Sequence, residues 1–489
     1  MHFNKILFTI FFCLLFFQAQ SQISINSDRL LTVKPTDSLL TIAKKPFTAA
    51  GLVLTTNMGV WSFDRFVIGG PYARVNFNTI VRNIKTGFVW DNDMFVTNLF
   101  AHPYHGGLYF NAARSNGMNF WQSTPYTAGG SLMWEFCMEN EPAAINDFMA
   151  TSIGGACLGE MTFRISDFVI DDRSVGFDRF KREVLLTLVS PIRELNRLLN
   201  GDAWKHRNIR GNSIAGPPVI FYTTIGHRII RDNTKKNKDV SNMLCYDIGL
   251  YYGNPFDKEN EKPYDFFSLK VAGNFFSQQP VISRVNALGM LYARDITLSR
   301  PSRQLTLGIF QHFNFYQSQA DINNVSLSPY KISEAASVGP GLLYKIKLTQ
   351  HISLSSSLHL SAMLLGGSQT DHFRFEKRDY NMGSGFTSKL SVELNFADKA
   401  RLFLNTEDYR LYSWIGYNPA DTETINSNVQ GDVGIARLSV ARLNLNYTIR
   451  KHFLIAVETS YYYRKSVYKY YPSVMHSTVE NKISVGYVF

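Results

Sequence analysis

The sequence predicts an α+β membrane protein, in which an N-terminal α-helical domain precedes an antiparallel transmembrane β-barrel of about twelve strands. Three observations lead to this prediction. From about residue 217 to the end, apolar and polar residues alternate, which gives each strand one apolar and one polar face. Residues 46–202 do not alternate and contain helical segments separated by Gly and Pro. The first residues of the chain also have the pattern of an export signal.

The export signal is the stretch "MHFNKILFTIFFCLLFFQAQSQ". Lys5 gives a short positive region, residues 6–17 form an apolar core, and Ala19 and Ser21 suit a cleavage site. We therefore predict a signal peptide over 1–21, followed by a flexible segment over 22–45. The apolar run is short for a membrane anchor, which needs roughly 20 residues. An exported chain is not expected to bind nucleic acid.

The composition indicates a folded chain without a disulfide framework. Hydrophobic residues make up 45% and charged residues 18% of the 489 residues, so the chain is not of the disordered class. The net charge of +11 favours a solvated basic surface over specific binding of anionic lipid. Beyond the signal, the cysteines are Cys137, Cys157 and Cys245. Their odd number favours buried thiols, with one Cys137–Cys157 bridge as the alternative.

The helical domain is expected over 46–202 and is joined by a linker, 203–216, to the barrel over 217–489. Helical segments are predicted at 126–141, 144–170 and 181–201, with Pro191 as a break and Gly201 after the last helix. Ser152, Gly155 and Gly159 lie near one stripe, which permits close helix packing. A barrel of about twelve strands has a narrow lumen, so we expect this domain beneath the barrel, with partial plugging as the alternative.

The strands are clearest in three stretches. In "ISLSSSLHLSAML" (352–364), Leu and Ala take one face, and Ser and His359 take the other. "KLSVELNF" (389–396) sets Leu390 and Val392 against Lys389. "QLTLGIFQHFNF" (304–315) repeats the pattern and ends with Phe315. Alternation of this kind predicts one apolar and one polar face for each strand.

The connections predict which ends of the strands meet. Short turns ("SRPSR", "LTQH", "FADKA", "TIRKHF") alternate along the chain with long polar loops near 317–334, 366–383, 413–433 and 464–480. Short turns on one side and long loops on the other are typical of an outer-membrane barrel. The strand pattern is weakest near 254–282, where the inner connection is longer than the outer one. A change of apolar face at Ala441 suggests a β-bulge.

The chain ends in "KISVGYVF", in which Ile483, Val485, Tyr487 and Phe489 share one face. This ending resembles the C-terminal strand that outer-membrane barrels present to the barrel assembly machinery. The resemblance implies that Tyr487 and Phe489 form an assembly signal.

A polar cluster is predicted in the helical domain. The segment "FAHPYHGGLYFNAARSNGMNFW" contributes His102, His105, Asn111 and Arg114, and helical periodicity sets His105 in phase with Asp91 and Asn98. The neighbouring helices contribute acidic residues, namely Glu135, Glu139, Asp147 and Glu160.

Four interpretations of this cluster are open. We favour a buried network in which Arg114, with His102 or His105, neutralises the acids and fixes helix register, because acids in apolar helices are costly unless paired. A general acid/base site and a ligand pocket are the alternatives. The HxxH pattern alone is a poor zinc motif because a third ligand is missing. We therefore expect no metal and no cofactor.

The segments "NDMFVTNLFAHPYHGGLYFNAARSNG", "SLMWEFCMENEPAAINDFMATSIGGACLGE" and "PIRELNRLLNG" are fairly specific when taken together. Over residues 60–200, the chain resembles a Gram-negative, Bacteroidetes-type outer-membrane family in which a domain of unknown function (DUF3943-like) is fused to a β-barrel. The resemblance implies an envelope location and supplies no chemistry.

Together these features predict an outer-membrane protein with its helical domain on the periplasmic side. The expected function is non-enzymatic, in transport, lipid handling or envelope scaffolding. The alternative is an outer-membrane enzyme acting on lipid or lipopolysaccharide through a His/carboxylate site. The expected partners are outer-membrane lipids, lipopolysaccharide and the assembly machinery, and any small-molecule ligand is unknown.

Overall fold

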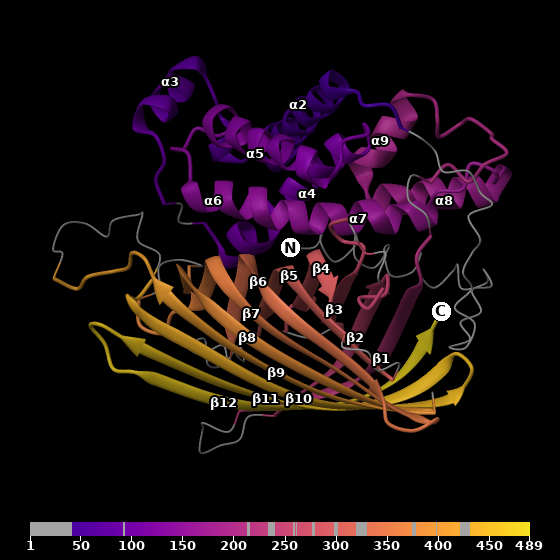
Figure 1. The fold of residues 1–489 in the computed structure, drawn as a ribbon. Coiled ribbons are helices and arrows are strands. Elements are labelled where there is room, and N and C mark those ends of the chain that lie inside the picture. Colours follow the sequence, from indigo (N-terminus) through magenta and orange to yellow (C-terminus); the bar gives the residue numbers. More distant parts are fainter. Residues whose placement is uncertain are drawn as a thin grey trace.

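The computed structural model describes residues 42–90, 93–212, 216–232, 240–257, 260, 262–275, 279–297, 302–318, 330–373, 378–397, 399–420 and 431–489. The predicted signal peptide, most of the segment 22–45, and Asp91 lie outside these residues. The described part divides into helices followed by strands, as the sequence predicts (Figure 1).

The helices occupy Pro46–Leu199 and begin and end where local sequence signals indicate. Asn76 and Asn119 form capping boxes at two N-termini. Pro103 and Pro191 lie in the first turn of a helix, and Gly201, with φ +76°, follows the last one. The helices are α2 (Pro46–Phe63), α3 (Phe77–Thr86), α4 (His102–Arg114), α5 (Phe120–Cys137), α6 (Ile145–Met149), α7 (Gly155–Val169), α8 (Gly176–Val189) and α9 (Pro191–Leu199), with short turns η1 (Asp64–Ile68), η2 (Pro71–Ala73), η3 (Thr97–Ala101) and η4 (Ala150–Gly154).

The strands form one closed antiparallel barrel in which each strand pairs with its neighbours in sequence and β1 pairs with β12. This confirms the predicted fold class and the count of twelve. The strands are β1 (Val219–Asp232), β2 (Val240–Tyr252), β3 (Phe267–Phe275), β4 (Ile282–Asp295), β5 (Arg303–Gln317), β6 (Lys331–Lys347), β7 (Ile352–Gln369), β8 (Tyr380–Phe396), β9 (Ala400–Ser413), β10 (Gly434–Arg450), β11 (Phe453–Tyr468) and β12 (Val474–Val488).

The two ends of the barrel differ in their connections. One end, here called the turn end, has the connections 253–266, 296–302, 348–351, 397–399 and 451–452. The other, the loop end, has 233–239, 276–281, 318–330, 370–379, 414–433 and 469–473; all of the first and parts of the next four lie outside the described residues. The predicted short turns are confirmed. The exception predicted near 254–282 is also confirmed, because the turn-end connection 253–266 is longer than the loop-end connection 276–281.

Two predictions about the last strands are wrong. The expected loop over 464–480 is mostly strand, because β11 continues to Tyr468 and β12 begins at Val474. The polar residues of this stretch alternate into the lumen, and their polarity resembled that of a loop. β10 has no bulge at Ala441, since its pairing continues unbroken from Gly434 to Thr448. Its apolar face changes because Leu438 and Val440 pack inside the barrel.

The helices form a layer on the outside of the barrel wall (Figure 1). On β5, the residues that face away from the lumen show this directly. Leu307 and Ile309 are each 47% exposed, whereas Phe313 and Phe315 on the same face are buried under helices. The other wall residues that share this buried cluster are Leu250, Tyr252, Phe267, Val285, Ala287, Ala335, Ala336, Leu365, Tyr380 and Met382.

This layer reaches both ends of the barrel. Near the loop end, Trp90 packs against Trp414 in a tilted arrangement with ring centroids 4.6 Å apart, and Asn98 donates to the Tyr380 hydroxyl at 2.9 Å. At the turn end, Arg164 donates to the Pro263 carbonyl at 2.7 Å. The helical domain therefore lies beside the barrel. None of the described helices plugs the lumen or hangs beneath it, which corrects both placements expected from sequence.

The described cysteines are thiols, as favoured from the sequence. Cys157 and Cys245 are buried free thiols, and Cys137 is a partly buried free thiol. Among the described residues, no helix is long and apolar enough to cross a membrane.

Glycines allow the central helices, α4 and α7, to touch through their backbones. A Cβ atom on Gly155 would lie 2.5 Å from the Cα of Gly106, and one on Gly106 would lie 1.9 Å from the Thr151 carbonyl oxygen. Gly159 packs in the same way against Phe110. The small-residue stripe predicted at Gly155 and Gly159 is confirmed as a helix crossing of the kind that small residues permit.

We expect Gly155→Ala to lower the free energy of unfolding by about 1–3 kcal/mol, because the new methyl group overlaps the α4 backbone. Gly129→Ala is the matched control. A Cβ there meets nothing within 4 Å, so the change should be neutral or slightly stabilising. Denaturant unfolding of the purified protein in detergent measures both variants. Equal effects of the two substitutions would contradict the close crossing.

Candidate functional site

The most extensive cluster of charged residues lies in the barrel lumen and was not predicted from sequence. Its members project inward from strands all around the barrel, and the two signs balance. The acids are Asp247, Glu334, Glu407, Glu458 and Glu480, and the bases are Arg228, Arg284, Lys389, Arg442 and Lys482. We call these ten residues the lumen network.

One part of the network joins the first strand to the last. Arg228 of β1 lies 2.5 Å from Glu480 of β12, and its guanidinium also donates to the Asn274 side chain at 3.0 Å and to the Tyr330 hydroxyl at 2.8 Å. Tyr330 stacks on Tyr462, with ring centroids 4.1 Å apart. These contacts fill the lumen from β3 to β11.

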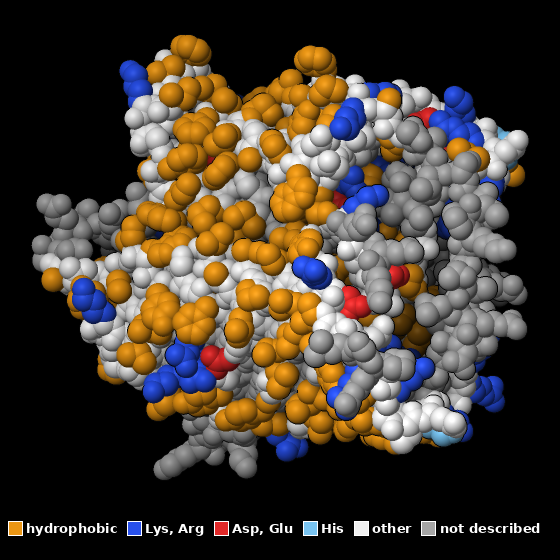
Figure 2. All heavy atoms as spheres, in the orientation of Figure 1, with side chains coloured by type: hydrophobic (Ala, Val, Ile, Leu, Met, Phe, Trp, Pro, Cys, Tyr) orange, Lys and Arg blue, Asp and Glu red, His pale blue; other side chains and the backbone are white. Residues whose placement is uncertain are grey.

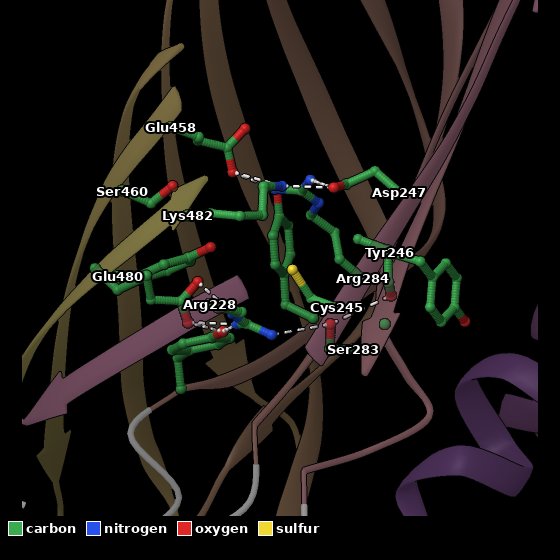
Figure 3. A pocket seen from close by; sticks show the side chains of 15 residues that line it. Arg228, Cys245, Tyr246, Asp247, Ser283, Arg284, Glu458, Ser460, Glu480 and Lys482 are labelled. Carbon is green, nitrogen blue, oxygen red and sulfur yellow. Dashed lines mark hydrogen bonds and ion pairs between the residues drawn. The ribbon is translucent and has the colours of Figure 1, made fainter. Parts of the chain in front are cut away.

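A second part crosses the middle of the lumen. Lys482 of β12 lies 2.6 Å from Asp247 and 3.3 Å from Glu458, and Arg284 of β4 contacts the same two acids. Arg442 of β10 lies 3.7 Å from both Glu458 and Glu407. Figure 3 shows Lys482 and Arg284 between the carboxylates of Glu458 and Asp247.

A third part surrounds the fully buried Glu334 of β6. Lys389 of β8 makes a short ion pair with this carboxylate, and the side chains of Asn314, Ser337, Ser361 and Thr387 also donate to it. Lys389 was predicted on the polar face of its strand, and it does point into the lumen. Its partner was not predicted, because the two strands are separated in the chain.

Little space remains among these side chains. The cavity between Arg228, Asp247, Arg284, Glu458 and Lys482 has a volume of about 20 Å³ (Figure 3). A cavity of roughly 10–15 Å³ holds one water molecule. The lumen at this level therefore has room for water but not for a solute.

The polar cluster predicted in the helical domain separates into several parts. Arg114 is the partner of Glu160, as favoured from sequence, with distances of 2.6 Å and 3.1 Å to its two carboxylate oxygens. Arg164, four residues after Glu160, contacts the same carboxylate at 2.8 Å. Arg164 also lies 3.2 Å from Asp265, so the chain of ion pairs continues into the barrel.

The two histidines contact different sets of residues. His102 lies between Asp147, at 3.6 Å, and the Thr151 hydroxyl, at 3.4 Å. His105 contacts the Tyr109 hydroxyl at 2.9 Å and packs on the ring of Trp134.

The remaining predicted residues bind the backbone or neighbouring side chains. Glu135 accepts the backbone N–H of Ala144 at 2.8 Å, and Glu139, beyond the end of α5, accepts the indole N–H of Trp134 at 2.6 Å. Asn111 donates to the Gly107 carbonyl and to the Thr162 hydroxyl, both at 2.9 Å.

Asn98 and His105, predicted to be in phase, contact different partners: Asn98 binds the Tyr380 hydroxyl of the barrel, and His105 binds the Tyr109 hydroxyl of its own helix. The π-helical turn η3 (Thr97–Ala101) shifts the phase before α4 begins at His102.

Sequence reasoning missed a second charged cluster, where α8 and α9 meet the chain that leads to the barrel. The buried carboxylate of Asp172 lies 2.7 Å from Arg197 and 2.8 Å from Arg207. Arg197 also contacts Glu183 at 3.1 Å and Glu194 at 3.7 Å. Burial and the neighbouring carboxylate of Glu183 raise the pKa of Glu194 to about 8.

The described residues contain no group of three or more His, Cys, Asp or Glu side chains placed to hold a metal ion. At the end of the chain, Tyr487 stacks on His452, with ring centroids 5.3 Å apart, and Phe489 packs on Phe221 of β1. The two predicted assembly residues thus lie at the turn end, beside the seam between β1 and β12. Their recognition by the assembly machinery stays a prediction.

Comparison with known proteins supports the family resemblance over the helical region. Residues 87–192 match the family described as Domain of unknown function (DUF3943). No curated protein matches the sequence significantly.

Several solved outer-membrane barrels resemble the chain weakly. The NanC porin has 12% identity and a TM-score of 0.27 over 54% of this chain and 98% of its own. The KdgM porin in complex with disordered oligogalacturonate has 10% identity and a TM-score of 0.24, over 55% and 99%. The channel DcaP of Acinetobacter baumannii has 10% identity and a TM-score of 0.23, over 56% and 98%. These low TM-scores support no statement about what this chain does.

The raised pKa of Glu194 predicts a pH dependence of stability. Between the ordinary pKa of 4.5 and about 8, the folded chain holds a proton that the unfolded chain releases, so stability falls as pH rises through this window. We expect Glu194→Gln to flatten this slope, because the amide stays neutral.

Thermal unfolding at pH 5.5, 6.5 and 7.5 measures the effect. Glu393→Gln, at a half-buried position on β8, is the control and should keep the wild-type slope. A Glu194→Gln variant with an unchanged slope would show that another group is responsible.

Proposed function

We propose that this protein is a non-enzymatic outer-membrane scaffold whose barrel has a sealed lumen and holds a helical domain against its outer wall. The lumen network is the observation that supports this proposal. Its side chains meet from opposite strands and leave a cavity of about 20 Å³. Each acid is matched by a base, so the charges hold one another in place and are not free to line a water-filled path.

An outer-membrane position suits the exterior of the barrel. Side chains that face away from the lumen form an apolar surface, which is what lipid contact requires. Those at least 37% exposed include Leu358, Leu360, Leu404, Leu443, Leu445, Ile455, Val457, Ile483 and Val485. Because barrels of this class have short periplasmic turns, we place the turn end, with the start of β1 and the end of β12, in the periplasm.

This orientation fixes the expected partners. Outer-membrane phospholipid and lipopolysaccharide contact the apolar wall, and the assembly machinery meets the final strand through Tyr487 and Phe489. The part of the helical domain nearest the periplasm is then α8 and α9, together with Arg164, whose contacts lie at the turn end.

We expect the purified protein to show no steady conductance in a planar lipid bilayer, because the lumen network occupies the path. The double variant Arg284→Ser with Glu458→Ser removes one base and one acid, keeps the net charge, and should produce a measurable unitary current. Single-channel recording measures both proteins.

The matched control is Arg437→Ser with Asp408→Ser. This pair lies 2.6 Å apart on the outer face of β9 and β10, where its removal leaves the lumen unchanged. A steady wild-type current would overturn the sealed-scaffold proposal, and a current in the control variant would show that it does not depend on the lumen.

A second candidate is an outer-membrane enzyme that acts on lipid or lipopolysaccharide. One observation favours it: the ring of His102 lies between a carboxylate and a hydroxyl, which is the arrangement of a base held by an acid beside a nucleophile. Asp147 and Thr151 are buried, however, which suits a structural contact better than access of a substrate.

His102→Ala separates the two candidates. Under the scaffold proposal, it lowers thermal stability and changes no lipid product. Mass spectrometry of the lipids after incubation with the wild type and the variant gives the comparison. Products that form with the wild type and vanish in a variant of wild-type stability would favour the enzyme.

A further inference from the structure

The helical layer covers wall that would otherwise contact lipid. Phe313 and Phe315 face away from the lumen on β5, in line with Leu307 and Ile309, which are exposed. Helices that cover the outer wall of a membrane barrel occupy the place of lipid. Their contacts extend from Trp414, near the loop end, to Pro263, at the turn end, so the layer lies beside the barrel over its height.

The outer helices of this layer have the charge distribution of a lipid-facing segment. From Pro46 to Phe63, helix α2 contains no charged residue, whereas Lys44 and Lys45 precede it and Asp64 and Arg65 follow it. Helix α5, beside it, contains Glu135 as its only charge, and this side chain is buried. Charges are thus excluded from the middle of the layer's surface, as they are in the hydrocarbon region of a bilayer.

Large apolar side chains occupy that surface. Figure 2 shows hydrophobic side chains in orange over the helical layer and again on the barrel wall below it. A soluble domain rarely exposes a patch of this kind without a partner. The exposed members on the helices are Phe47, Leu54, Met58, Phe63, Phe66, Val67, Ile68, Phe77, Ile84, Tyr104, Trp121 and Leu132.

The turn end of the layer resembles a membrane–water interface. Phe177 and Phe180 of α8 are 73% and 63% exposed and stack on one another, and the Lys181 ammonium lies over the Phe177 ring. Trp204, 77% exposed, follows α9 and is adjacent to Lys205. Aromatic residues with basic neighbours are typical of the level of the lipid head groups.

We propose that the helical layer is immersed in the bilayer beside the barrel, with the exposed apolar side chains of α2 and α5 in contact with lipid acyl chains. The inference rests on the outer-membrane position proposed above. We infer that lipid covers this surface because the surface adjoins the outer wall of the barrel, which we place in contact with lipid. The charged residues nearest to α2 in the chain also lie beyond both of its ends.

A fluorescent probe at three positions tests the proposal. Leu54→Cys, 49% exposed in the middle of α2, is the test site. Leu443→Cys, 50% exposed on the outer face of β10, reports the barrel wall, and Tyr470→Cys, 40% exposed in the connection 469–473, reports water. All three are made in a background with Cys13→Ala and Cys137→Ala, since the remaining thiols, Cys157 and Cys245, are buried.

Each full-length variant is labelled with bimane and inserted into phosphatidylcholine vesicles. Acyl chains brominated at mid-chain quench a probe in the hydrocarbon, and aqueous iodide quenches a probe in water. We expect Leu54→Cys to match Leu443→Cys, with several-fold stronger quenching by bromine than by iodide, and Tyr470→Cys to show the reverse.

The other outcomes are distinct. If the Leu54 probe follows Tyr470 while the Leu443 probe is quenched by bromine, the helical layer lies in water and the inference is overturned, although the barrel remains a membrane protein. If the Leu443 probe is also quenched by iodide alone, the outer-membrane position fails and the inference fails with it. The conductance experiment is unaffected by the first of these outcomes.

Discussion

The pairing of buried charges is the constraint on which this structure depends. A charge taken out of water costs several kcal/mol unless an opposite charge and hydrogen bonds replace the solvent. In the lumen, Glu334 is fully buried and is surrounded by Lys389 and by hydroxyl and amide donors. Removal of one partner leaves the other uncompensated, so the network holds together as a unit.

The same constraint operates between the helices and the barrel. Glu160, which is fully buried, receives Arg114 from α4 and Arg164 from its own helix, and Arg164 continues to Asp265 of the connection 253–266. The apolar contact of Phe313 and Phe315 with the helices is not directional. The ion pairs at Arg164 are directional, and they fix where α7 ends against the barrel.

Local periodicity was sufficient to predict the barrel. Alternation in "ISLSSSLHLSAML" and "KLSVELNF" places Leu360 and Leu390 outside and His359 and Lys389 inside, as the structure has them. The lumen residues of β11 and β12 were mistaken for a loop, because the polar face of a strand and a polar loop have the same composition. The predicted count of twelve strands was not affected, because two strands joined by one connection were expected whether that connection was long or short.

The position of the helical layer could not be predicted in this way. Leu307, Ile309, Phe313 and Phe315 form one apolar face in the sequence. In the structure, Leu307 and Ile309 are exposed on the outer wall, whereas Phe313 and Phe315 are buried under the helices. Both environments select apolar side chains, so alternation does not distinguish them. The ion pair between Glu160 and Arg164 could have been predicted from the sequence, because residues four apart on a helix are neighbours. The contact of Arg164 with Asp265 is tertiary and left no local signal.

The lumen network also accounts for how a chain of this topology closes. Strands β1 and β12 lie at opposite ends of the barrel sequence, and their pairing closes the barrel. A slip of one residue in this pairing turns each inward side chain outward. Arg228 and Glu480 meet across that seam, and Lys482 reaches over β1 to Asp247. In a slipped register, Arg228 or Lys482 would face lipid, where a basic side chain costs about 2–4 kcal/mol near the midplane. The buried charges of the lumen network therefore favour the one register in which all of them face inward.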